Sequence, residues 1–150
     1  EPTLHNGNRM IVDKISYKIK DPERFDIIVF RATAEKDYIK RVIGLPGDTV
    51  EYRDDVLYIN GKAYDEPYLD AYKAQLAEGD LLTYNFTMEE LIGEKVVPEG
   101  RLFVLGDNRR VSNDSREIGT ISMEAVVGKT SIVYWPLKEI RIERYNEPEK

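Results

Sequence analysis

The chain has 150 residues, a formal net charge of -6, no cysteine and a single histidine, His5. This acidic balance argues against a nucleic-acid partner, because proteins that bind nucleic acids usually carry a basic stripe. The absence of cysteine excludes a disulfide scaffold, a thiolate metal site and a cysteine nucleophile. With one histidine, a zinc site built from imidazoles or a Ser-His-Asp triad is hard to assemble.

The length of the chain suits one domain, or two small lobes that share a core. No stretch approaches the roughly 18 consecutive apolar residues that a membrane-spanning helix requires. The sequence starts at Glu1 without an initiator methionine and without a signal-peptide pattern. We therefore expect it to be a fragment of a longer protein.

Short apolar or β-branched runs, bounded by Gly, Pro, Asp or Asn, recur along the chain and predict strands. Several of them alternate between apolar and charged residues, as Val50 and Tyr52 do with Glu51 and Arg53. This alternation is typical of a strand with one buried face. The predicted strands are residues 10–12, 27–30, 38–45, 49–52, 56–59, 102–105, 131–135 and 140–145.

The segments between these runs contain recognisable turns and two short helices. Pro and Gly at the centre of residues 45–48 favour a type II turn, and Asp54-Asp55 and Asn60-Gly61 favour hairpin turns. Residues 87–93 have a capping box and a final glycine, which predict one or two helical turns, and residues 122–128 are a similar candidate.

These elements predict a mostly β fold with an antiparallel, barrel-like or sandwich-like core and one or two short helices. The middle of the chain is rich in Tyr, Glu, Asp and Lys and has weaker periodicity. We interpret residues 51–98 as an inserted β-rich cap subdomain. Residues 1–50 and 99–150 then form a discontinuous main core.

Lys40 and Arg41 interrupt an otherwise apolar run, and adjacent strand residues face opposite sides of a sheet. One reading is an edge strand protected from aggregation by its charges. The other is a buried lysine that is held neutral. A free lysine has a pKa near 10.4, so lowering that value to about 8 requires roughly 3 kcal/mol, which burial can supply. Such a lysine could accept a proton from a serine hydroxyl.

Residues 106–119 follow a predicted strand and are dense in Asp, Asn and Ser, which favours side-chain-to-backbone turns. The segment is not an EF-hand loop, because Arg109 and Arg110 occupy positions where ligands are needed. It is either a solvated loop with internal ion pairs or a scaffold that brings hydroxyls and fixed charges to a site.

Taken together, three segments resemble the type I signal peptidases of bacteria, particularly the shorter Gram-positive form. The resemblance runs in order over essentially the whole chain, and Asp65-Glu66-Pro67-Tyr68-Leu69 also resembles a family segment. The first segment, Glu1-Pro2-Thr3-Leu4, is similar to the end of an S-M-x-P-T-L motif. The second, Tyr38 to Asp48, matches the lysine motif of the family. The third matches the motif G-D-N-R…S-x-D-S-R with Gly106-Asp107-Asn108-Arg109, Ser112, Asp114, Ser115 and Arg116.

The resemblance implies a membrane-associated serine endopeptidase with a Ser/Lys dyad, which removes signal peptides from exported proteins and needs neither a metal nor a cofactor. It assigns Lys40 as the general base and Ser112 as the hydroxyl that orients it. It also implies supporting ion pairs between Asp114 and Arg116 and between Asp107 and Arg41. Alternation along the strand agrees, because Arg41 faces away from Lys40 and needs a carboxylate.

The family motif places the nucleophilic serine upstream of Glu1, so we expect this fragment to be inactive. The resemblance also implies an upstream transmembrane anchor, a catalytic domain on the extracytoplasmic face of the cell membrane, and contact with the lipid surface. The signal peptide is expected to add as a strand beside residues 37–40 and 1–4, with shallow pockets for Ala-x-Ala side chains. The expected substrate-binding residues are Asp37, Tyr38, Ile39, Met10, Val29 and Pro2.

Two other readings stay open. A self-cleaving repressor of related fold would keep the Ser/Lys dyad, but the 106–119 loop, the inserted cap and the acidic charge disfavour it. A non-catalytic, β-rich binding module for export substrates would require a residue other than serine two positions before Glu1.

Overall fold

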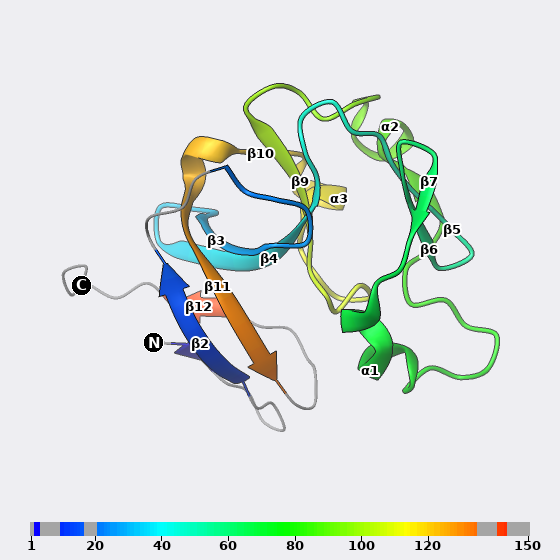
Figure 1. Ribbon diagram of the computed structural model, residues 1–150, viewed down its shortest axis with the longest axis horizontal. Coiled ribbons are helices and arrows are strands. Elements are labelled where there is room, and N and C mark those ends of the chain that lie inside the picture. The colour runs from blue at the N-terminus through cyan, green and yellow to red at the C-terminus, as the bar shows by residue number, and fades with distance from the viewer. Residues whose placement is uncertain (1, 4–9, 17–20, 135–140, 144–150) are drawn as a thin grey trace.

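The computed structural model describes residues 2–3, 10–16, 21–134 and 141–143, and its side chains from residue 21 to residue 130. His5 and Trp135 lie outside these residues. Figure 1 shows a large sheet on one side, a small sheet on the other and β9 between them. As predicted, the fold is mostly antiparallel β with short helices.

The large sheet has eight strands, six of them in the order β1-β12-β4-β3-β11-β2, with β9 paired to β4 and β10 to β9. Every pairing in it is antiparallel. Its strands are β1 (Pro2–Thr3), β2 (Met10–Ser16), β3 (Ile27–Arg31), β4 (Lys36–Gly44), β9 (Arg101–Leu105), β10 (Ile121–Ser122), β11 (Val126–Tyr134) and β12 (Arg141–Glu143).

The small sheet has four strands in the order β7-β6-β5-β8. All of it except Val50, the first residue of β5, lies within the cap segment, residues 51–98. Its strands are β5 (Val50–Arg53), β6 (Val56–Ile59), β7 (Lys62–Tyr64) and β8 (Phe86–Thr87). One buried cluster joins this sheet to β4 and β9, because Tyr52 and Leu57 share it with Ile43 and Phe103. The two sheets therefore share a core, to which β4 and β9 contribute from the large sheet.

The predicted turns are confirmed by their backbone. Asp48 N–H donates to the carbonyl of Leu45 and Gly47 has a φ of 90°, as a type II turn requires. Asp54 and Asp55 both have positive φ, at 51° and 67°, and they join β5 to β6. Positive φ at both central residues is the signature of a type I′ hairpin turn, which matches the twist of the strands.

The helices agree only in part with the sequence. α2 (Met88–Ile92) starts at the Thr87 cap and ends at Gly93, as predicted. The prediction of a helix over residues 122–128 is wrong except for a single 3-10 turn, Met123–Ala125. The helix cannot continue because Val126 already starts β11 and pairs with Phe30. The residue pattern did not predict α1 (Asp70–Lys73), α3 (Ser115–Ile118) or the 3-10 turn Pro67–Leu69. Each is about one turn long, too short for helical periodicity to show.

Asp48 fastens the end of β4 to the small sheet. Burial alone would raise the pKa of this carboxyl, but hydrogen bonds from Arg24, from Leu45 N–H and from Asn60 outweigh burial and hold the pKa below its usual value. The carboxylate therefore stabilises the fold above the unfolded-state value of about 3.9, and this contribution is lost as the pH falls through the lower folded-state pKa.

We expect Asp48→Asn to lower the free energy of unfolding at pH 7 by about 2 kcal/mol, because hydrogen bonds to a charged group are replaced by weaker ones. The difference from the unmodified chain should persist down to about pH 5 and narrow below pH 4. Urea unfolding across this pH range measures it, with Asp80→Asn, an exposed carboxyl, as the control. A difference that grows on acidification would contradict the assignment.

Candidate active site

Lys40 lies in the middle of β4, and its Nζ donates a 2.7 Å hydrogen bond to the hydroxyl of Ser112, 72 residues further along the chain. Lys40 is only 5% exposed. Its neighbours on the same face of the sheet are apolar or aromatic: Ile28 is its cross-strand partner, and its Nζ is 5.3 Å from the centre of the Tyr38 ring. The expectation of a buried lysine is therefore confirmed over that of an exposed edge charge.

Arg41 points to the opposite side, as alternation predicts. Its guanidinium donates to both carboxylate oxygens of Asp107, at 3.0 and 2.7 Å, and to the carbonyl of Phe25. It also stacks on the Tyr68 ring, with 3.7 Å between the guanidinium carbon and the ring centre. The two adjacent side chains thus hold the same loop at two points, Lys40 at Ser112 and Arg41 at Asp107.

The loop that carries Ser112 is held by side chains inside its own sequence. Asp114 is fully buried; it caps α3 by accepting from Arg116 N–H, and it forms a two-point ion pair with the Arg116 guanidinium. Its Oδ2 also accepts from Gly106 N–H at 2.9 Å. The Ser115 hydroxyl accepts from Val104 N–H and so ties α3 to β9. Both predicted pairs, Arg41–Asp107 and Asp114–Arg116, are present in the structure.

Gly106 forms the wall against which Lys40 and Ser112 lie. A Cβ at this position would be 1.7 Å from Ser112 Oγ and 3.2 Å from Lys40 Nζ. No side chain fits at the first of these distances, so the backbone itself fills the space beneath the two groups. Glycine is needed here for close approach.

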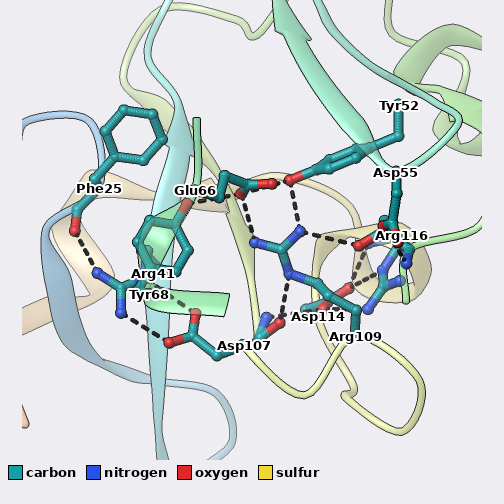
Figure 2. A network of polar contacts seen from close by, with 12 residues as sticks. Phe25, Arg41, Tyr52, Asp55, Glu66, Tyr68, Asp107, Arg109, Asp114 and Arg116 are labelled. Carbon is teal, nitrogen blue, oxygen red and sulfur yellow. Dashed lines mark hydrogen bonds and ion pairs between the residues drawn. The ribbon is translucent and has the colours of Figure 1, made fainter. Parts of the chain in front are cut away.

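A second buried network, which the sequence analysis did not identify, centres on Arg109 and Glu66. Their side chains are 0% and 2% exposed and form a 2.9 Å ion pair. Figure 2 shows Arg109 held between Glu66 and Tyr52, with Tyr68 linking Glu66 to Arg41. The only sequence signals were the position of Arg109 in the G-D-N-R segment and that of Glu66 in the Asp65–Leu69 segment.

The expected substrate-binding residues do not all lie on the face of the sheet that carries Lys40. Tyr38 shares a face with Lys40, whereas Ile39 and its cross-strand partner Val29 are buried on the face that carries Arg41. Asp37 is also buried. The side chains of Met10 and Pro2 lie outside the described residues.

The edge of β4 beside Lys40 was expected to be free over residues 37–40, but part of it is paired. β12 pairs with Lys36–Tyr38 and β9 pairs with Arg41–Gly44, so β4 changes partner around Ile39 and Lys40. β12 also pairs with β1 and lies between it and β4. Any added strand along residues 37 and 38 would have to displace β12.

Comparison with known proteins identifies the family. The family model for "Signal peptidase, peptidase S26" matches residues 1–135. The chain belongs to the peptidase S26 family of signal peptidases. Among similar family members, signal peptidase I of Bacillus caldolyticus is 53% identical over 142 residues, which are 95% of this chain and 78% of that protein. Signal peptidase IB of Staphylococcus aureus is 46% identical over 145 residues, covering 94% and 75%.

A solved structure agrees with this membership. The crystal structure of a signal peptidase I from Enterococcus faecalis V583 superposes with a TM-score of 0.70 at 46% identity, covering 76% of this chain and 100% of the other. The resemblance read from the motifs is therefore confirmed at the level of family and fold, and the chain is a hydrolase of the signal peptidase S26 family.

Within the described residues, no helix combines the length and the apolar character that spanning a membrane requires. No three His, Cys, Asp or Glu side chains within the same part of the chain are grouped so that they could hold a metal ion.

Proposed function

We propose that this chain is the catalytic part of a membrane-associated serine endopeptidase with a Ser/Lys dyad, which cleaves N-terminal signal peptides from exported proteins after small residues of the Ala-x-Ala type. The observation that carries the proposal is the buried Lys40 amine, 2.7 Å from the Ser112 hydroxyl, in a chain that matches the S26 family over residues 1–135. Its relatives carry the name signal peptidase I.

In this mechanism Lys40 is the general base. Burial penalises the ammonium form of a lysine, which favours the neutral amine that a base requires. The amine takes the hydroxyl proton as the serine oxygen attacks the scissile carbonyl, and returns it to the leaving amine, so that an acyl-enzyme forms. It then activates the water that hydrolyses the ester. Ser112 accepts a hydrogen bond from Lys40 Nζ and so aims it.

The nucleophile in this proposal is the serine that the S-M-x-P-T-L resemblance places before Glu1. Asp107 and Asp114 hold the loop through Arg41 and Arg116.

We also propose that the chain divides into a core of residues 1–50 and 99–150 and a cap of residues 51–98. The extended signal peptide and the lipid surface on the extracytoplasmic side of the membrane are its partners. Asp37, Tyr38, Ile39, Val29, Met10 and Pro2 remain the proposed substrate contacts.

The test uses the natural full-length protein in detergent with a preprotein substrate. We expect a single cut after the second alanine of an Ala-x-Ala site, identified by the mass of the product. A substrate with phenylalanine in place of that alanine should be cut at least about 100-fold more slowly, since a pocket shaped for a methyl group cannot accept the ring. Binding of the preprotein without any cleavage would instead support the binding module.

A further inference from the structure

Glu66 comes from the cap segment, yet its carboxylate is buried against the loop of the catalytic core. One oxygen, Oε2, accepts from Tyr52 OH at 2.8 Å, from Tyr68 OH at 2.7 Å and from Arg109 Nη2 at 2.9 Å. Burial and the neighbouring Glu66 raise the pKa of both phenols, so Tyr52 and Tyr68 stay protonated and serve as fixed donors. The carboxylate is thus held by three donors from separate segments.

Arg109 extends this constraint to the backbone beside Lys40 and Ser112. While Nη2 binds Glu66, Nε of the same guanidinium donates to the carbonyl of Gly106 at 2.8 Å. The N–H of Gly106 donates to Asp114, so both polar groups of this residue are bound by charged side chains. Since a planar guanidinium presents its donors in a rigid fork, the position of Glu66 sets the position of the Gly106 carbonyl.

Gly106 in turn sets the place of Lys40 and Ser112. The position a Cβ would occupy is 1.7 Å from Ser112 Oγ and 3.2 Å from Lys40 Nζ, so this backbone packs directly against both groups. A shift of Gly106 toward them would clash, and a shift away would leave a gap beneath the hydrogen bond that joins them. The contacts therefore run from the cap through Arg109 and Gly106 to Lys40 and Ser112. Figure 2 shows the first of these contacts, between Glu66 and Arg109.

We propose that the buried Glu66–Arg109 pair is a positioning pair of the catalytic site, which acts through Gly106 to hold Lys40 Nζ in line with Ser112. The inference rests on the proposed function and adds to it a role of the cap in the chemical step. An apolar pair of the same volume could fill this space equally well, and buried ion pairs are often replaceable without loss of stability. What an apolar pair cannot supply is the directed N–H to the Gly106 carbonyl.

The test compares two variants with the unmodified full-length enzyme. Glu66→Leu/Arg109→Met removes both charges together, which avoids an unpaired buried ion, and Glu66→Gln keeps the shape but removes the charge. The control is Asp48→Asn, which weakens the partly buried Arg24–Asp48 pair, whose partners are Arg24, Leu45 N–H and Asn60 rather than Gly106. For each variant kcat, KM and the melting temperature are measured, and the double variant is also crystallised.

We expect kcat of the double variant to fall about 30- to 100-fold, because misplacement of reacting groups by about 1 Å costs that much. KM should change less than about threefold and Asp48→Asn should keep kcat within about twofold, since the contacts to Gly106 remain. In the crystal structure of the double variant the Lys40 Nζ to Ser112 Oγ distance should exceed about 3.5 Å, beyond a hydrogen bond.

The inference is overturned if the double variant keeps kcat and the 2.7 Å separation, or if Asp48→Asn loses kcat to the same extent. Failure of the proposed function is a different result, in which the unmodified enzyme itself cuts no preprotein. In that case the crystal structure still decides, because a Lys40–Ser112 distance that stays unchanged in the double variant refutes the positioning role.

Discussion

Lys40→Ala in the full-length protein is expected to lower kcat by about 10⁴-fold, because the variant has no base for the serine hydroxyl. The Lys40 amine is buried beside Ile28 and Tyr38 and is joined to Ser112. KM should change little, since the amine acts on the reacting proton rather than on the peptide. Steady-state cleavage of a preprotein measures both constants.

The matched control is Lys36→Ala, which removes another lysine from β4. Lys36 is exposed and lies on the same face of the strand, four residues before Lys40. Its loss should leave kcat within about twofold, because a solvated amine has no part in the proton transfer. Cleavage that survives in Lys40→Ala would remove this residue from the mechanism, and equal losses in both variants would point to charge on the strand rather than to a base.

Gly106→Ala is expected to reduce kcat by about 100-fold or more and to destabilise the fold by about 1–3 kcal/mol. The new methyl group would overlap Ser112 Oγ at 1.7 Å and Ser112 Cβ at 2.5 Å, so the hydroxyl must leave its place beside Lys40. Steady-state kinetics and thermal unfolding measure the two effects.

Two further variants separate the clash from other effects of the alanine. Adding Ser112→Gly removes both overlapping atoms, so stability should recover by about 1 kcal/mol while activity stays low, since the hydroxyl that orients Lys40 is gone. Gly100→Ala is the control: φ is 75° there and no atom lies within 4 Å of the new Cβ, so it should lower stability by about 1 kcal/mol without lowering kcat. A Gly106→Ala enzyme with full activity would show that the wall is not needed.

Much of the local structure follows from neighbouring residues, which is why it could be predicted. The turns at residues 45–48 and 54–55 depend on Pro, Gly and Asp at fixed positions, and the backbone conformations they prefer are the ones observed. The opposite directions of Lys40 and Arg41 follow from the two-residue period of a strand. α2 was predicted from its capping box and final glycine, whereas the other short helices were missed or misplaced because one turn contains too few residues to show a period.

The strand pairing could not be read in the same way. The expected free edge at residues 37–40 depended on which strand neighbours β4, and β12, about 100 residues away in sequence, occupies part of it. Likewise, alternation shows that Ile39 lies opposite Lys40, but only the pairing with Val29 shows that both are buried on the face of Arg41.

The sequence by itself determined the family, the mostly β fold, the excluded chemistries and the residue types of the site, because motifs and periodicity are properties of neighbouring residues. The resemblance implied that Ser112 orients Lys40, and the structure brings the two side chains together. Only the tertiary structure decided that Gly106 is the wall beneath them and that Glu66 of the cap binds Arg109. Lys40 and Ser112 are 72 positions apart in the sequence, and Glu66 and Arg109 are 43 positions apart. These contacts form because the core shared by the two sheets brings these distant segments together. Burial of a polar group without a hydrogen bond is costly, so the buried side chains bind one another.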